Sequence, residues 1–133
     1  MGNEKINKFI FGFIFLVICF ALDRFSKIYI LNILDNEGVV DLYINQYLNI
    51  YLVWNTGIGF GLFSSENIFF YNLFTAIIVI INIVILYFAF IETKIKSFFL
   101  IIILGGSLGN LFDRFYYRAV PDFIDLNYDG YHW

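Results

Sequence analysis

The sequence has little of the chemistry that most small metalloproteins and disulfide-rich domains use. It holds one cysteine, Cys19, and one histidine, His132, and only 14% of its residues are charged, against roughly 25% in soluble domains. A single cysteine excludes a disulfide framework and a cysteine-based metal cluster, and a lone histidine argues against a histidine-rich metal site. No basic run is present that could bind nucleic acid. We therefore expect no metal and no cofactor, and any chemistry must rest on carboxylates, amides, hydroxyls and basic side chains.

Hydrophobic residues are abundant instead. They make up 61% of the 133 positions, which leaves too little polar surface to cover a water-soluble globule. A membrane-spanning helix needs about 20 predominantly apolar residues, and the apolar runs predict spans over about residues 9–31, 69–91 and 98–114. The chain is therefore predicted to be a single membrane domain, residues 1–133, built as an all-α helix bundle.

The lysines predict how this bundle is oriented. Lysines precede the first run and occupy the loop between the second and third, at Lys5, Lys8, Lys94 and Lys96. No lysine or arginine occurs between residues 31 and 69. The positive-inside rule then predicts a cytoplasmic N-terminus, with residues 32–68 and those after 112 on the outer side. The first run could instead be a secretory signal peptide, but no small-residue cleavage site follows it, which favours a retained helix.

The segment between the first two spans, about residues 39–63, is rich in Val, Ile and Tyr with partial alternation. This pattern predicts a β-rich outer segment closed by a glycine-rich turn. The alternative is an aromatic interfacial loop without a sheet. The glycines at 57, 59 and 61 do not complete a dinucleotide-binding motif, because no parallel strand, helix or later acidic residue accompanies them. The amide of Asn55, just before them, is a candidate to hold a peptide or a carboxylate.

Charged residues interrupt the end of the first span. A charge in the middle of a spanning helix costs roughly 2.5–3.5 kcal/mol, and less near an end. Asp23 and Lys27 are four residues apart and can pair along one helix face, with Arg24 between them. We interpret this group as structural support for a site, and the alternative is a self-neutralised helix end.

The third span ends in the sequence "GGSLGNLFDR". Gly105 and Gly109 are four residues apart, a spacing that lets membrane helices pack closely. Close packing does not explain the polar residues that follow, Asn110, Asp113 and Arg114. Asn110 and Arg114 share a helix face, and a guanidinium can form a bidentate contact with a carboxylate or with carbonyl oxygens.

The closing segment, "VPDFIDLNYDGYHW", carries Asp122 and Asp125 on either side of an apolar pair that would hold it at the membrane surface. A carboxyl group at such a boundary is a candidate general acid or base, whereas a solvated acidic loop would not need the apolar pair. On a helical turn, Asp125 would approach Asp122. Asp113 is expected to pair with Arg114 or Arg118.

Four motifs of this sequence, in order, resemble those of one family, lipoprotein signal peptidase (signal peptidase II), a bacterial membrane aspartic protease. They are "LDRFSK", "NTGIGF", "GGSLGNLFDR" and "DFID", and together they span nearly the whole chain. Small departures are Gly59 and Ser107, where the family usually has Ala, and Pro121, where it usually has an aliphatic residue. The resemblance implies a multi-pass hydrolase of the bacterial inner membrane, with its active site at the outer face. Its substrates would be diacylglyceryl-modified prolipoproteins, cut before the lipidated cysteine.

The resemblance also implies a fold and residue roles. The fold is a membrane helix bundle, three of whose four spans are present, with a small outer β-cradle. Asp122 matches one of two catalytic aspartates. Asn55, Asn110 and Arg114 match residues that bind substrate. Structural support is expected from Asp23, Lys27, Gly105, Gly109, Asp113 and Asp125. Lipid-modified prolipoproteins and membrane lipids would be the partners.

The largest departure concerns the second catalytic aspartate. In the family it lies in an "FNxAD" motif at the start of a fourth helix, and the 133 residues contain no such motif. Two carboxylates divide the roles in this chemistry, one activating water while the other polarises the carbonyl. We therefore expect a chain truncated before its last transmembrane helix and inactive alone. The competing hypotheses are a non-catalytic remnant and a small membrane protein that binds lipid or a partner helix through its glycine face.

Overall fold

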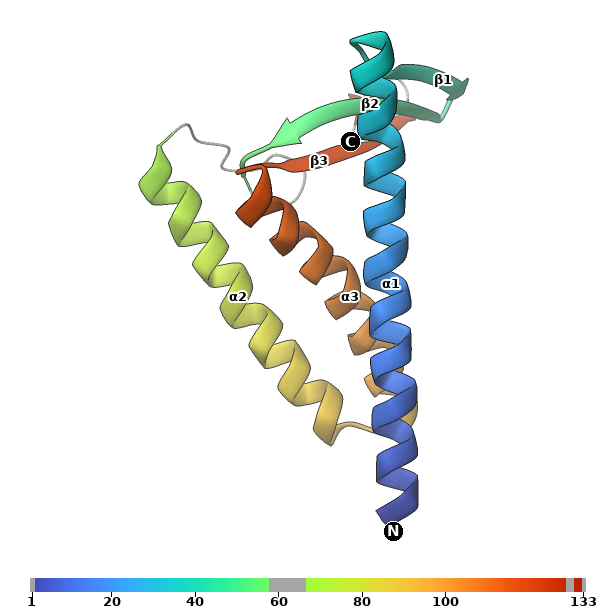
Figure 1. Cartoon of the computed structure of the whole chain (residues 1–133), viewed down its shortest axis with the longest axis vertical. Coiled ribbons are helices and arrows are strands. Elements are labelled where there is room, and N and C mark those ends of the chain that lie inside the picture. Colours follow the sequence, from blue (N-terminus) through green and yellow to red (C-terminus); the bar gives the residue numbers. More distant parts are fainter. Residues whose placement is uncertain (1, 58–66, 129–130, 133) are drawn as a thin grey trace.

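The computed structural model describes residues 2–57, 67–128 and 131–132. Three long helices and a small antiparallel sheet make up this part of the chain (Figure 1). The helices are α1 (Gly2–Glu37), α2 (Ile68–Ile91) and α3 (Lys94–Tyr116). Each contains a stretch that is long and apolar enough to cross a membrane. The predicted membrane helix bundle with a small β-cradle is therefore confirmed.

Helix α1 is longer than the span predicted over residues 9–31. Its 36 residues correspond to about 54 Å at the rise of an α-helix, well beyond a hydrocarbon core of about 30 Å. The helix continues through polar residues until Gly38, whose φ of 75° is left-handed. The Gly38 N–H donates to the Leu34 carbonyl over 2.8 Å, so this glycine ends the helix as a C-terminal cap. The last turns of α1 therefore rise to the level of the sheet (Figure 1).

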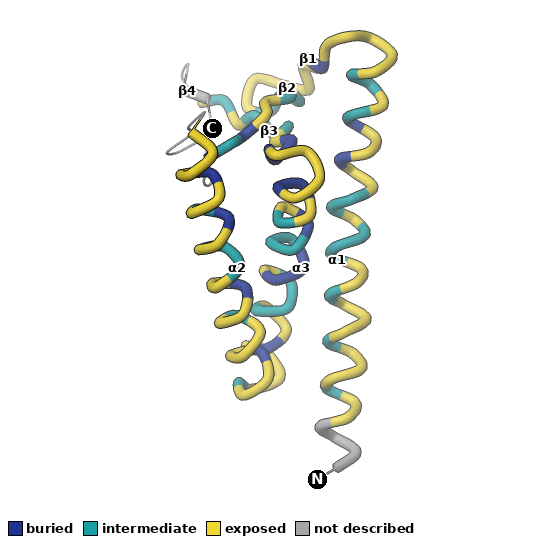
Figure 2. The backbone as a smooth tube through the Cα atoms, turned by 60° about the vertical axis from the view of Figure 1, so that its left-hand side comes forward, coloured by how far each residue is buried: buried dark blue, intermediate teal, exposed yellow. Residues whose placement is uncertain are grey.

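Helices α2 and α3 form a tight hairpin at the end opposite the sheet. The Asn67 side chain caps the start of α2 by accepting from the Phe69 N–H over 2.8 Å. At its other end, the buried Ser97 hydroxyl of α3 donates to the Ala89 carbonyl over 2.6 Å. Helix α3 also packs against α1 and so lies between the other two helices (Figure 2). Any site at the sheet end of α3 can thus receive residues from every part of the fold.

The sheet joins segments that are far apart in the sequence. Its strands are β1 (Asp41–Asn45), β2 (Leu48–Asn55), β3 (Val120–Tyr128) and the short β4 (Tyr131–His132), in the order β1-β2-β3-β4. Strands β1 and β2 fall inside the predicted segment 39–63, of which residues 58–63, with the glycines at 59 and 61, lie outside the described residues. Strand β3 is antiparallel to β2, with Asp122 opposite Val53. This pairing brings the closing segment beside Asn55.

Burial follows the pattern of a membrane protein. Many large apolar residues of the helices are exposed, where lipid rather than water would surround them, and Figure 2 shows exposed positions along all three helices. The buried residues lie on the helices and in or beside the sheet, and they include an unusual number of polar ones, among them Lys27, Asp113 and Arg114. Buried charges are expensive unless they are paired and hydrogen-bonded, so these residues mark the places where the fold has a specific polar arrangement.

Candidate active site

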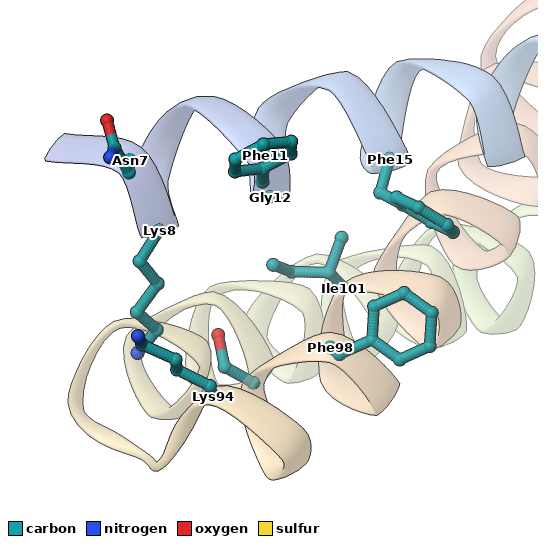
Figure 3. Close-up of a pocket in the computed structure, with 9 residues that line it drawn as sticks. Asn7, Lys8, Phe11, Gly12, Phe15, Lys94, Phe98 and Ile101 are labelled. Atoms are coloured by element: carbon teal, nitrogen blue, oxygen red, sulfur yellow. The ribbon is translucent and has the colours of Figure 1, made fainter. Parts of the chain in front are cut away.

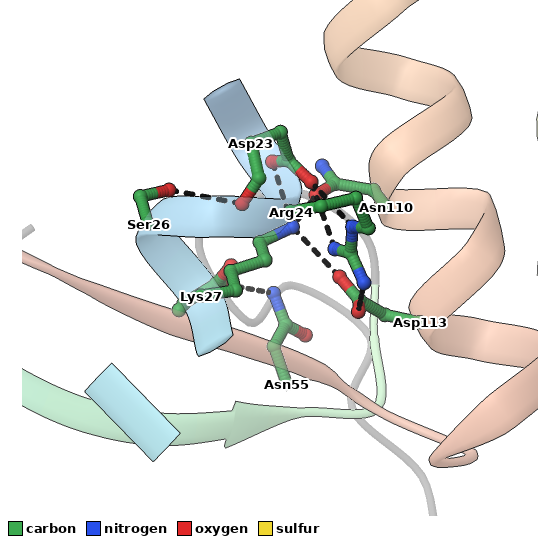
Figure 4. A network of polar contacts seen from close by, with 8 residues as sticks. Asp23, Arg24, Ser26, Lys27, Asn55, Asn110 and Asp113 are labelled. Atoms are coloured by element: carbon green, nitrogen blue, oxygen red, sulfur yellow. Dashed lines mark hydrogen bonds and ion pairs between the residues drawn. The ribbon is translucent and has the colours of Figure 1, made fainter. Parts of the chain in front are cut away.

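A cluster of charges joins α1 to α3 beside the sheet (Figure 4). We call Asp23, Arg24, Lys27, Asn110 and Asp113 the charge cluster. Asp113 is completely buried, and its two carboxylate oxygens accept hydrogen bonds from Arg24 Nη1 over 2.6 Å and Lys27 Nζ over 2.7 Å. Each oxygen of this carboxylate thus has its own cationic partner, the arrangement that a buried charge requires.

Asp23 completes the balance of charge. Its carboxylate oxygens lie 2.9 Å from Lys27 Nζ and 2.8 Å from Arg24 Nη2, and Lys27 Nζ also donates to Asn110 Oδ1 over 2.6 Å. Two acidic and two basic side chains therefore neutralise each other. The predicted pair between Asp23 and Lys27 is confirmed, and the structure adds Asp113 to it.

Two glycines allow α1 to come this close. A Cβ added to Gly105 would lie 2.6 Å from the Cβ of Cys19, and one added to Gly109 would overlap the carboxylate of Asp23. Both glycines predicted to form a close-packing face thus lie against α1, and the second makes room for a member of the charge cluster.

The prediction that Asp113 pairs with Arg114 or Arg118 is wrong. Asp113 points toward α1, where Arg24 and Lys27 take both of its oxygens. Neighbouring residues on a helix diverge by about 100°, so Arg114 points elsewhere.

A second polar group lies between the sheet and α3, and we call Asn55, Gly57, Arg114 and Asp122 the Asp122 site. Asp122 is an exposed residue of β3. The Asn55 side chain, at the end of β2 and almost fully buried, donates from Nδ2 to Asp122 Oδ2 over 2.7 Å. Asn55 Oδ1 accepts from the Gly57 N–H over 2.8 Å. The amide group of Asn55 therefore fixes both the turn after β2 and one oxygen of Asp122.

Arg114 extends this group toward α2. Its Nη2 donates to the Gly57 carbonyl, its guanidinium lies 5.6 Å from the centre of the Tyr71 ring, and its own carbonyl accepts from the Tyr71 hydroxyl over 2.7 Å. The residue is only 4% exposed, yet its Nε and Nη1 have no hydrogen-bond partner among the described residues. These two buried nitrogen atoms of a permanent cation are candidates to bind a ligand.

Asn110 and Arg114 do not form one pair, although they share a helix face. Asn110 accepts from Lys27 in the charge cluster, whereas Arg114 reaches the turn at Gly57 in the Asp122 site. The two side chains have different partners because Arg114 is long enough to reach the turn that follows β2, whereas the shorter Asn110 side chain contacts Lys27 of α1. The charge cluster and the Asp122 site are consequently separate groups, each of which includes residues from the last turns of α3.

Asp125 does not share the position of Asp122. The segment is a strand rather than a helical turn, so residues three apart point to opposite faces. The Asn49 side chain donates to Asp125 Oδ2 over 3.4 Å. The sequence held a signal for this strand, since apolar and polar residues alternate from Ile124 to Tyr128 with a period of two.

The chemistry available at the Asp122 site is that of an exposed carboxylate beside a membrane span. Asn55 donates to one of its oxygens, and no described residue donates a hydrogen bond to the other. Among the residues that the structure describes, no three His, Cys, Asp or Glu side chains are grouped so that they could hold a metal ion. The geometry suits proton transfer by a carboxyl group with a fixed orientation.

Comparisons with known proteins agree on a family. The family model for signal peptidase II matches residues 15–133. A lipoprotein signal peptidase of Pelagibacter ubique is 41% identical over all of this chain and 80% of its own length. One of Anaplasma phagocytophilum is 38% identical over 96% of this chain and 81% of its own length. A solved structure described as a bacterial membrane enzyme superposes with a TM-score of 0.69 at 26% identity, covering 90% of this chain and 72% of that one.

Proposed function

Since this chain belongs to the signal peptidase II family of membrane proteases, we propose that it acts on diacylglyceryl-modified prolipoproteins and cuts before the lipidated cysteine. The observation that carries the proposal is the position of Asp122, exposed on β3 and held by Asn55 at the end of the membrane helices. A lipid-anchored substrate presents its scissile bond at that depth. Asp122 is the residue to which we assign the chemistry.

The reaction needs a water molecule activated beside a polarised carbonyl. The Asn55 hydrogen bond to Oδ2 orients the Asp122 carboxyl group and leaves Oδ1 facing the substrate. When ionised, Asp122 takes a proton from water as the water attacks the peptide carbon, and a protonated second carboxyl group polarises the carbonyl. The collapse of the intermediate then returns a proton to the leaving amine.

We further propose that neither Asp113 nor Asp125 is the second carboxyl group of the reaction. Asp113 pairs with Arg24 and Lys27 through both of its oxygens, so its carboxyl group already has a role in the charge cluster. Asp125 points to the other face of β3. The 133 residues alone are therefore expected to lack peptidase activity. The same expectation followed from the family resemblance, because these residues contain no "FNxAD" motif.

Arg114 is proposed to hold the substrate with Asn55, and Asn110, whose Oδ1 accepts from Lys27 in the charge cluster, is proposed to contribute through its Nδ2. Nε and Nη1 of Arg114, which have no hydrogen-bond partner among the described residues, can bind carbonyl oxygens of an extended peptide. Gly57 fixes the guanidinium through its carbonyl, so the cation is oriented before the substrate arrives. The distribution of lysines supports an orientation with this site at the outer face of the bacterial inner membrane.

The competing hypothesis of a protein that binds a partner helix through its glycines finds less support. Gly105 and Gly109 are covered by α1 of the same chain. A partner helix would have to displace α1 and break the charge cluster to reach them. The remaining alternative, a non-catalytic remnant, is separated from an enzyme by the following experiment.

The test measures cleavage of a lipidated prolipoprotein peptide in detergent micelles. The substrate is offered to the 133-residue chain and to the same chain extended with the "FNxAD" segment of a relative. We expect cleavage by the extended chain only, and a loss of about 10²–10⁴-fold or more in Asp122→Asn. Asp125→Asn is the matched control and should keep most of the activity.

The outcomes separate the hypotheses. Cleavage by the 133-residue chain that disappears in Asp122→Asn would show that a second carboxyl group from outside these residues is not required. An extended chain that folds and binds the peptide without cutting it would support the remnant. Equal losses in Asp122→Asn and Asp125→Asn would remove the special role of Asp122.

A further inference from the structure

A pocket of about 520 Å³ lies between the first turns of α1 and α3, at the end of the bundle opposite the sheet. Figure 3 shows Lys8 and Lys94 at one end of this pocket and Phe15, Phe98 and Ile101 farther along the helices. Its volume is in the range of sites that hold small ligands. This pocket is separate from the Asp122 site, because the two lie near opposite ends of α3.

The lysine end carries positive charge that the described residues do not neutralise. Lys8 Nζ donates to the carbonyls of Phe90 and Glu92, over 3.3 and 2.7 Å, and these neutral contacts fix the ammonium in place with its charge intact. The one acidic side chain with a described ion pair at this end, Glu92, is paired with Lys96 over 3.2 Å. Lys94 takes part in no ion pair among the described residues. An anionic ligand would neutralise the positive charge at this end of the pocket.

The other end of the pocket is apolar. Phe15 and Phe98 meet edge to face with ring centres 4.7 Å apart, and Ile101 lies against Gly12, where an added Cβ would come within 2.7 Å of the Ile101 Cδ1. Lys94 begins α3, and Ile101 lies seven residues later, about 10 Å deeper along the helix. The polarity of the pocket thus changes from cationic to apolar along the length of α3.

This gradient is that of a phospholipid. Basic pockets between spanning helices bind anionic lipid headgroups, and an apolar groove below them can hold an acyl chain. We propose that this pocket binds one anionic phospholipid, with the phosphate between Lys8 and Lys94 and an acyl chain along Phe98 and Ile101. The lipid would bridge α1 to the α2–α3 hairpin, which Lys8 already touches through its contacts with the carbonyls of Phe90 and Glu92. Free phosphate would use only the lysines and leave the apolar end without a ligand.

The test uses the purified 133-residue chain in detergent and native mass spectrometry with added phosphatidylglycerol or phosphatidylcholine. We expect one phosphatidylglycerol to bind in preference to phosphatidylcholine. Lys94→Gln should weaken that binding about fivefold, the effect of one basic residue near a lipid surface. Lys96→Gln is the matched control, since Lys96 lies in the same first turn of α3 but is paired with Glu92, and it should leave the binding unchanged.

A second measurement locates the lipid. Photoreactive phosphatidylglycerol should cross-link to peptides that contain residues 7–15 and 94–101, and an excess of glycerol phosphate should not displace it. Equal weakening by Lys94→Gln and Lys96→Gln would indicate a diffuse charge effect and overturn the proposal. Displacement by glycerol phosphate would show a site for a free anion, and cross-links confined to other helices would place the lipid elsewhere.

Discussion

Two polar regions lie at the sheet end of α3, and they use their hydrogen-bonding groups differently. In the charge cluster, both oxygens of Asp113 have cationic partners and the charges cancel. In the Asp122 site, the carboxyl group is exposed with Asn55 on one oxygen, and the buried Arg114 keeps two donors without a described partner. Asp113 and Arg114 are neighbours on one helix. Asp113 thus belongs to a region whose charges are paired, and Arg114 to one that keeps donors without a described partner.

The contrast follows from the cost of burying charge. A carboxylate in a low-dielectric interior must be fully paired, or the fold is destabilised by several kcal/mol. A group that acts on a substrate must keep part of its capacity unused until the substrate binds. The charge cluster therefore has the properties of a structural brace between α1 and α3, whereas the Asp122 site has those of a binding surface.

The largest expected effect on stability comes from opening the cluster. Asp113→Asn leaves Arg24 and Lys27 with an uncompensated positive charge, and we expect a loss of about 3–5 kcal/mol in the free energy of unfolding. Asp122→Asn should cost about 1 kcal/mol or less, because the residue is exposed and the new amide can still accept from Asn55. Thermal unfolding of both variants in detergent measures the difference.

A double variant provides the control for this comparison. Asp113→Asn combined with Lys27→Gln removes one charge of each sign, so it should be more stable than the sum of the two single changes predicts. A fall in melting temperature for Asp113→Asn that is no larger than that for Asp122→Asn would mean that the cluster does not brace the helices.

Much of the fold could be predicted from the sequence because its signals are local. Apolar runs of spanning length predict the helices, and four-residue spacings predict the pairing of Asp23 with Lys27 and the glycine face. The partner of Asp113 could not be predicted, since Arg24 is 89 residues away and helical spacing says nothing about contacts between helices. The sequence did not predict strand β3. Its alternation of apolar and polar residues is short, and acidic residues such as those it contains are uncommon in strands.

The same reasoning applies to the candidate site. Asp122, Asn55 and Arg114 could be selected from motif residues at span ends, but their connection could not. It depends on the antiparallel pairing of β2 with β3 and on the turn at Gly57, whose N–H and carbonyl bind Asn55 and Arg114. Backbone groups carry no residue-specific signal, so only the structure shows that Gly57 links the two side chains.

A smaller effect is expected from filling the space that the cluster needs. Gly109→Ala would push a methyl group into the position of the Asp23 carboxylate, and overpacking of this kind costs typically about 1–3 kcal/mol. Gly106→Ala is the matched control, because nothing lies within 4 Å of a Cβ added there. It should be neutral or stabilise the helix by up to about 1 kcal/mol. Melting temperatures that shift in the same direction for both variants would contradict the close approach of Asp23.

The smallest effect tests whether unused polar groups mark function wherever they occur. Between α2 and α3, the Ser107 hydroxyl donates to Asn82 Oδ1 over 2.6 Å, and Asn82 Nδ2 has no partner among the described residues. Because hydrogen bonds between membrane helices contribute about 0.6 kcal/mol on average, Ser107→Ala should lower the melting temperature only slightly. It should leave peptide cleavage by the extended chain unchanged, since Asn82 lies within a span, several turns from Asp122. A loss of cleavage comparable to that of Asp122→Asn would extend the functional region into the membrane and erase the boundary between the two kinds of polar group.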